Sequence, residues 1–353
     1  MNNKIPVIIL GGSGYVGGEL LRLLSFNPNF YVDLVISDSQ EGKLIAEVFP
    51  HLKNILPSKK FISLNVGLEK LNNNNHWVVI SAANHGKSAH SINKIISKSK
   101  KKKIKINIID IAADFRFDNK SYFEDTYNQK HSAPEIIESF YCGIPEQLKK
   151  INKKNIAHPG CFATSMLLSI MPLVENNITE LEFSTSAVTG STGSGSQPKL
   201  NTHHPIRDSN FFAYNPLKHR HSIEVIHLIK KITKKEISLN FVPHSGPFTR
   251  GIHATTFCKL KDGYDDIMIN KIFSDYYKNN HFIDVVNAPP KMKDIVGTNN
   301  AQIYISTNHN YLVIFCVIDN LIKGAAGGAI QLANKLIGCA EEDGLKIPPI
   351  GWA

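Results

Sequence analysis

The sequence predicts an α/β protein that begins with a doubly wound parallel sheet and continues into a mixed or antiparallel sheet with covering helices. The first observation is an apolar run at residues 6–10 that leads into a glycine-rich loop and then a helical pattern. The second is a pair of buried strand patterns, at residues 77–80 and 107–111, that both end in polar loops. The third is a rise in β-branched strand patterns after residue 161.

The length and composition describe an ordinary globular protein. With 353 residues the chain is long enough for two domains, and 42% hydrophobic with 20% charged residues is typical of a soluble fold. No apolar run is long enough to span a membrane, and the N-terminus shows no signal-peptide pattern. The 5 cysteines are scattered without a CxxC pair. We therefore expect a cytoplasmic protein with reduced cysteines and no membrane partner.

A net charge of +10 raises the possibility of a nucleic-acid-binding protein. The densest basic run, residues 98–105, lies between a helix-like and a strand-like segment, where we expect a solvated loop. No aromatic or glycine residue interrupts it to offer stacking for bases. The sequence therefore favours a protein that does not bind nucleic acid.

The glycine-rich loop after the first strand predicts a dinucleotide site. Gly12, Gly14 and Gly17 satisfy G-x-G-x-x-G, and Gly11 opens an overlapping G-x-x-G-x-x-G before the helix at residues 19–24. Glycines in this place let the backbone approach a pyrophosphate that rests on the helix N-terminus. The alternative is a glycine-rich turn without a ligand.

Polar residues follow three of the predicted parallel strands. The second strand, residues 31–36, ends at Ser37-Asp38-Ser39, where such a sheet places the residues that contact the adenosine ribose. The loops at residues 81–86 and 113–116 follow the next two strands. Ligands of open parallel sheets bind beyond the carboxyl ends of the strands, so these loops should line one cleft.

Cys161 is the candidate nucleophile. It follows a Pro-Gly turn and precedes an apolar run at residues 166–171, so we expect the thiol where a loop enters a helix. The N–H groups and dipole of a helix N-terminus favour the thiolate and lower the thiol pKa from about 8.5. The alternative is a buried structural cysteine.

The second half of the chain predicts several further strands and a last helix. A hydroxyl-rich loop at residues 189–196 follows the first of these strands, and the tail from residue 324 continues as a helix through residue 337. The strand candidates are residues 182–188, 239–242, 251–258, 302–305 and 311–317.

Six motifs stand in a fixed order from residue 11 to residue 327. They are Gly11-x-x-Gly14-Tyr15-x-Gly17-Gly18-Glu19-Leu20, Ala113-Asp114-Phe115-Arg116, Tyr141-Cys142-Gly143-Ile144-Pro145-Glu146, Pro159-Gly160-Cys161, His219-Arg220-His221-x-x-Glu224, and Asp319-Asn320-Leu321-Ile322-Lys323-Gly324-Ala325-Ala326-Gly327. Together they resemble the N-acetyl-gamma-glutamyl-phosphate reductases, the arginine-pathway branch of the semialdehyde dehydrogenase superfamily.

The resemblance implies three parts of the fold and one reaction. It implies an NADP-binding Rossmann domain at residues 1–157, a central α+β domain for catalysis and subunit contacts at 158–318, and a C-terminal helix at 319–353 that returns to the first domain. The implied protein is a homodimer or homotetramer. It uses NADPH to reduce N-acetyl-glutamyl 5-phosphate to N-acetyl-glutamate 5-semialdehyde, with release of phosphate.

The resemblance also implies roles for individual residues. Cys161 forms a thioester and His219, with an unperturbed pKa of about 6.5, moves protons. Backbone N–H groups around Gly160 and Cys161, with the Thr189 hydroxyl, stabilise the oxyanion. The remaining implied contacts are Arg116, Thr189, Tyr214 and His221 for the substrate, and Gly11, Ser13, Gly14, Tyr15, Val16, Ser37, Ser39 and Asn320 for the cofactor.

Three of these residues have other interpretations. Arg116 is either a clamp for a carboxylate or phosphate or a structural ion-pair residue. His219 and His221 could hold a metal together with His203 or His204, but no nearby Cys or acidic residue completes a tetrahedral set at zinc-like spacing, so we expect no metal. Ser222 as a helix N-cap accounts for part of the same region.

The chain departs from the usual family pattern near the nucleophile and in one loop. His158 and Phe162 stand where the family commonly has Asn and Tyr. The loop at residues 190–205 is longer, and its Thr202-His203-His204-Pro205, followed by Phe212-Ala213-Tyr214, resembles the reductases that act on carrier-linked aminoadipyl phosphate. That lysine-pathway substrate stays open as the alternative.

The cofactor prediction is NADP, with NAD as the alternative. Asp38 stands where the family often has a cation for the 2′-phosphate, and a carboxylate there favours an unphosphorylated ribose. Ser37 and Ser39 can donate hydrogen bonds, and Lys43 can supply positive charge if Asp38 turns away.

Overall fold

The computed structural model describes residues 4–72, 76–148 and 153–351. The chain forms two compact units. Unit 1 comprises Met1–Pro159 with Ala325–Lys346, and unit 2 comprises Gly160–Gly324 with Ile347–Ala353. Within the described ranges, no helix is both long and apolar enough to cross a bilayer.

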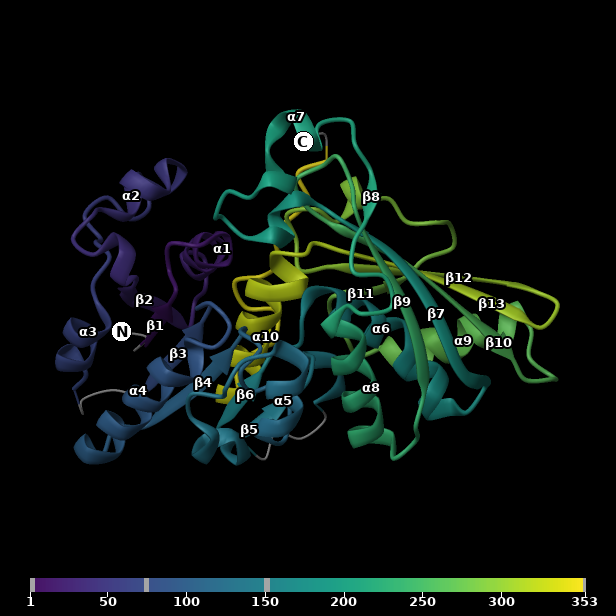
Figure 1. Cartoon of the computed structure of the whole chain (residues 1–353), viewed down its shortest axis with the longest axis horizontal. Helices are drawn as coiled ribbons and strands as arrows, with labels where there is room; N and C mark the ends of the chain where they lie inside the picture. The colour runs from purple at the N-terminus through teal and green to yellow at the C-terminus, as the bar shows by residue number, and fades with distance from the viewer. Residues whose placement is uncertain (1–3, 73–75, 149–152, 352–353) are drawn as a thin grey trace. The chain divides into compact units, whose positions relative to one another are not determined.

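Unit 1 contains the predicted doubly wound sheet. Its six strands are parallel and lie in the order β2-β1-β3-β4-β6-β5 (Figure 1). The strands are β1 (Ile5–Leu10), β2 (Phe30–Ile36), β3 (Trp77–Ser81), β4 (Ile106–Asp110), β5 (Phe140–Cys142) and β6 (Asn155–Ala157). The first four confirm the predicted strands. β1, β3 and β4 are almost wholly buried, as parallel strands covered on both faces are, whereas β2 at the edge of the sheet has an exposed Tyr31 and a half-buried Asp33.

Two pairs of helices pack in unit 1. α1 (Tyr15–Leu24) packs with α10 (Gly327–Ile337), and α3 (Leu64–Lys70) packs with α4 (Ser88–Lys102). The short α2 (Ile45–Val48) and α5 (Lys120–Tyr127) complete the unit. Since α10 also packs on β4, the expected return of the C-terminal helix to the first domain is confirmed.

The expectation of a loop at the basic run is wrong for its first five residues. Helix α4 continues through Lys102 and ends at Lys103, whose φ of 55° is left-handed. Ile92, Ile95 and Ile96 are buried at helical spacing, so the apolar stripe holds the segment in a helix while most of the lysines face solvent. Lysines in a last turn also complement the negative end of the helix dipole.

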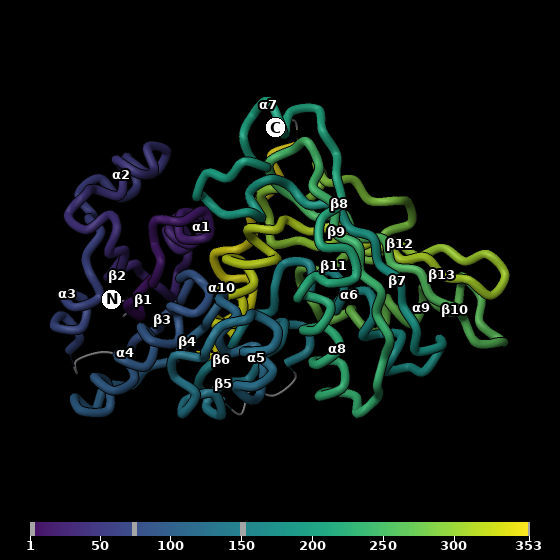
Figure 2. The backbone as a smooth tube through the Cα atoms, in the orientation of Figure 1, coloured from purple at the N-terminus to yellow at the C-terminus, as the bar shows by residue number. Residues whose placement is uncertain are grey.

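Unit 2 is built on a mixed sheet of seven strands in the order β11-β12-β13-β10-β7-β9-β8, as predicted for the second half of the chain. The pairs β7–β9 and β11–β12 are parallel and the others antiparallel. The long strands run side by side in Figure 2. Their bounds are β7 (Thr179–Thr189), β8 (Phe212–Ala213), β9 (Ser238–Ser245), β10 (Ile252–Leu260), β11 (Ile283–Val285), β12 (Ala301–Asn308) and β13 (Tyr311–Ile318).

Helix α6 (Cys161–Asn176) forms the centre of unit 2. It packs on β7, β10 and β13 and against α8 (Arg220–Thr233) and α9 (Asp266–Tyr277), and residues 162–174 are all buried. One face of the sheet is therefore covered, while alternate residues on the other face are half-buried or exposed. The long loop between β7 and β8 contains the short α7 (His204–Arg207).

The polypeptide leaves the second sheet through a tight turn. After β13 it forms a π-helical segment, Ile322–Ala326, and then α10, close to the helix predicted from residue 324. Within unit 1, Asn334 of α10 binds Asn27 and the carbonyl of Asp343.

Candidate active site

The glycine-rich loop of unit 1 forms a cradle that fits a dinucleotide. Gly11 has φ +69°, and a Cβ there would lie 2.5 Å from the carbonyl oxygen of Ala82. A Cβ on Gly17 would lie 2.4 Å from the oxygen of Gly12, whereas on Gly14 it would meet only the oxygen of Gly11, at 3.8 Å. No side chain caps α1 at Gly14. The helix N-terminus therefore offers open N–H groups and space for a pyrophosphate.

Three hydroxyl groups line the end of β2. Oγ of Ser13 lies 2.7 Å from Oγ of Ser37, which lies 3.4 Å from Oγ of Ser39. Asp38 turns to α3 instead, because its Oδ1 accepts the backbone N–H of Leu64 at 2.9 Å. Tyr15 and Val16 form the adjoining first turn of α1, and Tyr15 is 43% exposed.

Arg116 is buried in unit 1 and directs its donors at the protein. It is 4% exposed, its Nε donates to the carbonyl of His158 at 3.0 Å, and its Nη2 donates to the carbonyl of Ile111 at 2.7 Å. Nη1 lies 3.4 Å from the hydroxyl of Tyr127. These contacts give Arg116 a structural role, and its contact with the substrate remains a prediction.

In unit 2, Cys161 is the first residue of α6, as predicted. Gly160 precedes it as an extended N-cap without a side-chain hydrogen bond. The thiol is partly exposed, whereas Cys142, Cys258 and Cys316 are buried, and burial raises the pKa of Cys258 to about 12. Gly324 packs directly on Cys161, since a Cβ on Gly324 would lie 2.7 Å from Cβ of Cys161.

Glu224 holds the turn that precedes Cys161. Its buried carboxylate accepts the backbone N–H of Gly160 at 3.0 Å. The Gly160 N–H is therefore engaged by Glu224, and the role of the N–H groups around Gly160 and Cys161 toward an oxyanion remains a prediction. The remaining candidate donors are the N–H groups of the first turn of α6. His221 packs on the same turn, with Nε2 2.2 Å from the place of a Cβ on Gly160.

His219 is the N-cap of α8, which corrects the prediction for Ser222. Nδ1 of His219 accepts the backbone N–H of His221 at 3.2 Å, and Oγ of Ser222 donates to the carbonyl of His219. Because Nδ1 is an acceptor, the neutral ring carries its proton on Nε2. Burial, assisted by the Arg220 charge, lowers the pKa of His219 from 6.5 to about 4, against an opposing effect of Glu224. His219 is therefore neutral near pH 7.

An aromatic cluster surrounds this histidine. The ring centroid of His219 lies 5.6 Å from Phe162, 5.4 Å from Phe241, 5.7 Å from Tyr214 and 4.6 Å from His221. The pKa of Tyr214 is raised by burial and by the neighbouring charge of Cys161. The structure thus brings Cys161, Tyr214, His219 and His221 together in one part of unit 2.

Thr189 and Asn320 instead support the start of β10. The hydroxyl of Thr189 donates to the carbonyl of Gly251 at 3.5 Å, and Oδ1 of Asn320 accepts the N–H of Gly251 at 2.8 Å. Nδ2 of Asn320 donates to Oγ1 of Thr192. Both residues are buried and bonded within unit 2. Their roles toward substrate and cofactor remain predictions.

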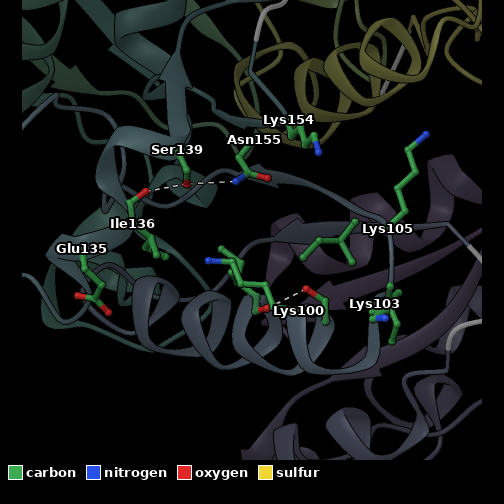
Figure 3. Close-up of a pocket in the computed structure, with 12 residues that line it drawn as sticks. Lys100, Lys103, Lys105, Glu135, Ile136, Ser139, Lys154 and Asn155 are labelled. Atoms are coloured by element: carbon green, nitrogen blue, oxygen red, sulfur yellow. Dashed lines mark hydrogen bonds between the residues drawn. The ribbon is translucent and has the colours of Figure 1, made fainter.

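The basic run borders a pocket at the amino ends of two strands of the first sheet. The pocket has a volume of about 340 Å³, and Figure 3 shows Lys100 of α4 and Lys103, which follows the helix, on one side and Lys154 on the other. Lys105 precedes β4 and Lys154 precedes β6, so the pocket lies at the amino ends of these strands, whereas the glycine-rich loop follows a carboxyl end. In the described part of the chain, no group of three His, Cys, Asp or Glu residues is placed to hold a metal.

Three residues of this structure were not predicted as site residues from the sequence. Glu224 lies in a quoted motif, but its contact with Gly160 spans 64 residues. Gly324 also lies in a quoted motif, and a glycine in that place could have indicated a close approach. Asp110, the polar last residue of β4, was assigned no role.

A parallel sheet with a dinucleotide cradle, followed in the chain by a mixed-sheet unit with a cysteine at a helix N-terminus, is the arrangement of an NAD(P)-dependent oxidoreductase. The family models match this division. The semialdehyde dehydrogenase NAD binding domain matches residues 6–158, and the semialdehyde dehydrogenase dimerisation domain matches residues 161–320. The chain belongs to the semialdehyde dehydrogenase family.

Curated relatives extend over nearly the whole chain. The LysW-L-2-aminoadipate/LysW-L-glutamate phosphate reductase of Saccharolobus solfataricus is 33% identical and covers 99% of both chains. N-acetyl-gamma-glutamyl-phosphate reductases of Clostridium botulinum and Methanococcus maripaludis are 35% and 34% identical, over 97% of this chain and 98% of theirs. These names support an NAD(P)-dependent enzyme of amino-acid biosynthesis that acts on phosphorylated acids.

Solved structures share the fold. Aspartate semialdehyde dehydrogenase II of Vibrio cholerae superposes with a TM-score of 0.69 at 17% identity, over 95% of this chain and 99% of that one. The aspartate semialdehyde dehydrogenase of Candida albicans, solved with NADP, gives 0.67 at 14% identity, over 96% and 99%.

Proposed function

We propose that this protein is an N-acetyl-glutamyl 5-phosphate reductase of arginine biosynthesis that uses NADPH and works in the cytoplasm. The observation that supports this most is the placement of Cys161 at the N-terminus of α6, in one cluster with Tyr214 and a neutral His219. That arrangement suits attack on an activated carboxyl carbon.

The chemistry begins with the thiolate of Cys161. The N–H groups and dipole of α6 stabilise the negative sulfur, which attacks the acyl carbon and expels phosphate. The C–O bond to phosphate breaks as the C–S bond forms, and the released phosphate takes a proton from solvent. NADPH, held by the glycine-rich loop at Gly11, Gly14 and Gly17, would supply the hydride for reduction of the thioester. The resulting alkoxide collapses to the aldehyde and returns Cys161 as a thiolate.

His219 acts in this scheme as a neutral hydrogen-bond donor. With Nδ1 engaged by the N–H of His221, the proton on Nε2 is available to the carbonyl oxygen of the substrate. Charge develops on that oxygen both in thioester formation and in reduction. Glu224 keeps the preceding turn in place through the Gly160 N–H and so positions Cys161.

Preference for NADP is proposed from the hydroxyl groups beside the cradle. Ser13, Ser37 and Ser39 form a chain of three hydroxyls, each able to donate to a phosphate. Asp38 has turned its Oδ1 to the N–H of Leu64, which weakens the case for Asp38 as a ribose 2′-hydroxyl acceptor. Lys43 in the following loop can supply positive charge.

A carrier-linked aminoadipyl phosphate is the second candidate substrate. The long loop that precedes His219 exposes apolar side chains: Leu200 is 78% exposed, Phe211 57% and Leu217 65%. Lys199 and Lys218 are exposed beside them. A basic, apolar loop is suited to an acidic protein carrier, and one relative is named for LysW-linked substrates.

We also propose that the enzyme is a homodimer or homotetramer. The uncovered face of the second sheet presents Tyr304 stacked on Phe315 at 6.0 Å, and a half-exposed Phe257 on the neighbouring β10. Apolar surface of this kind is typical of a subunit contact. The matching family model is described as a dimerisation domain.

The substrate proposal is tested in the reverse direction. Purified protein is assayed with N-acetyl-glutamate 5-semialdehyde, phosphate and NADP, and in parallel with a carrier-linked aminoadipate semialdehyde. We expect phosphate-dependent reduction of NADP with the free compound. Activity with the carrier-linked compound alone would reverse the order of the two candidates.

A further inference from the structure

Asp110 occupies the point in unit 1 where three strand ends meet. It is the last residue of β4 and is fully buried. Its carbonyl accepts the backbone N–H of His158, after β6, and the next residue, Ile111, donates its N–H to the carbonyl of Ser81, at the end of β3. The carboxyl ends of these strands form the edge at which parallel sheets bind ligands.

The Asp110 carboxyl group is unequally bonded. Oδ1 accepts the hydroxyl of Ser88 at 2.6 Å and the N–H of Ala112 at 3.1 Å. Oδ2 is buried and has no hydrogen-bond partner within residues 4–72, 76–148 and 153–351. An ionised oxygen without a donor is costly in a buried site, whereas a protonated carboxyl has no such charge. The geometry therefore favours the neutral acid.

Burial and the neighbouring charges also favour the neutral acid on balance. Burial and the nearby Asp114 carboxylate raise the pKa of Asp110 to about 7, against the opposing effects of Ser88, Ala112 and Arg116. Besides Asp110, Asp114 and Arg116, the titratable groups of this network are three histidines. His85 accepts the N–H of Ala113, and His131 contacts the carbonyl of Asp114; the third histidine is His158, described above.

This network reaches the dinucleotide cradle through one loop. Because the hydroxyl of Ser88 donates its hydrogen bond to Asp110, the hydroxyl of Ser81 is the donor in the 2.7 Å contact between the two serines. Asp114 accepts the N–H groups of Gly86 and Ala89, each at 2.9 Å. These bonds hold residues 82–86 at both ends.

The same loop forms one wall of the cradle. The N–H of Ala82 donates to the carbonyl of Leu10, and the oxygen of Ala82 lies where a Cβ on Gly11 would collide with it. A shift of residues 82–86 would therefore alter the glycine-rich loop that receives the pyrophosphate.

We propose that Asp110 is a positioning residue for the dinucleotide and that it acts as a neutral carboxylic acid. Its ionisation would place a second negative charge beside Asp114, the carboxylate that holds Gly86 and Ala89, and this repulsion would loosen residues 82–86 and weaken coenzyme binding. This inference rests on the proposed use of a nicotinamide dinucleotide. It concerns binding and leaves the identity of the acyl substrate open.

The first test compares NADPH binding by the wild type and Asp110→Asn from pH 6 to pH 9. Asn keeps the shape of the neutral acid and cannot ionise. We expect the affinity of the wild type to fall relative to that of the variant as the pH rises, by about tenfold if binding shifts the pKa of Asp110 by one pH unit. Because the 2′-phosphate of NADPH titrates equally for both proteins, the ratio of affinities reports on Asp110. A pH-independent ratio would overturn the proposal.

The second test needs no ligand. The carboxyl carbons of aspartate are labelled with carbon-13 in the full-length wild type, and their resonances are followed with pH. We expect one resonance to titrate near pH 7 and to move to higher pH in Ser88→Ala, which removes a donor to the carboxylate. The absence of any aspartate titrating well above pH 4 would overturn the inference, even if NADPH binds normally.

The two tests separate this inference from the proposed function. Titration near pH 7 without NADPH binding at any pH would refute the proposed coenzyme and the positioning role with it. Normal NADPH binding with Asp110 titrating near pH 4 would refute the positioning mechanism alone.

Discussion

Replacement of His219 by Asn tests whether this histidine is neutral in the folded protein. The folded-state pKa of about 4 lies below the ordinary value of 6.5, so between these values the unfolded chain binds a proton that the folded chain does not. The contribution of His219 to the free energy of unfolding is therefore fully present above pH 6.5 and is lost as the pH falls toward 4. At 1.36 kcal/mol per pH unit, the difference of 2.5 units corresponds to about 3 kcal/mol.

The assay is urea unfolding of the wild type and His219→Asn at pH 7.5 and pH 4.5. Asn is a good N-cap, so the substitution keeps an acceptor for α8 while it removes the titration. We expect the free energy of unfolding of the wild type to fall by roughly 2 kcal/mol more than that of the variant. His203→Asn, at an exposed histidine of the preceding loop, is the control and should lose stability as the wild type does. An equal loss in wild type and His219→Asn would refute a neutral, buried His219.

Three further predictions concern other parts of the site. Gly324→Ala should cost about 1–3 kcal/mol of stability and lower kcat, because its Cβ would lie 2.7 Å from that of Cys161; Gly193→Ala, whose Cβ would meet a Thr189 atom no closer than 3.4 Å, should be nearly neutral in both measurements. The ratio of kcat/KM for NADP to that for NAD should exceed one in the wild type and change little in Asp38→Arg; a wild type that prefers NAD and is switched by this substitution would show that Asp38 faces the ribose. Phe315→Lys with Tyr304→Lys should shift the protein toward monomers in sedimentation velocity, and unchanged sedimentation would argue against this face as the subunit contact.

The fold of unit 1 was largely predictable because its signals are local. The strands β1 and β3 are nearly continuous apolar runs, as expected for strands buried on both faces, and the glycine-rich loop marks the turn between β1 and α1. β5 and β6 were missed because each has only three residues, too few to show a periodicity. The sequence predicts a loop from residue 98, whereas α4 continues through Lys102. The run of lysines masked this continuation of the helix, whose apolar face is formed by the buried Ile92, Ile95 and Ile96 just before the run.

The residues of the candidate site could be predicted from the sequence, but their hydrogen-bond partners could not. The helix start at Cys161 follows from the Pro-Gly turn and the apolar run after it. Ser222 is a better N-cap than His219 by local preference, but Phe162, Tyr214 and Phe241 pack around the His219 ring and fix it at the cap. The lowered pKa of His219 has the same tertiary origin, because burial depends on residues distant in the sequence.

The most direct test of the proposed function is the acyl-enzyme itself. The protein is mixed with N-acetyl-glutamyl 5-phosphate in the absence of NADPH, the reaction is stopped with acid, and peptides are analysed by mass spectrometry. We expect one N-acetyl-glutamyl group on Cys161, one phosphate released per active subunit, no adduct in Cys161→Ser, and loss of the adduct when NADPH is added. An acyl group on another residue, or phosphate release without any adduct on Cys161, would contradict thioester catalysis by Cys161.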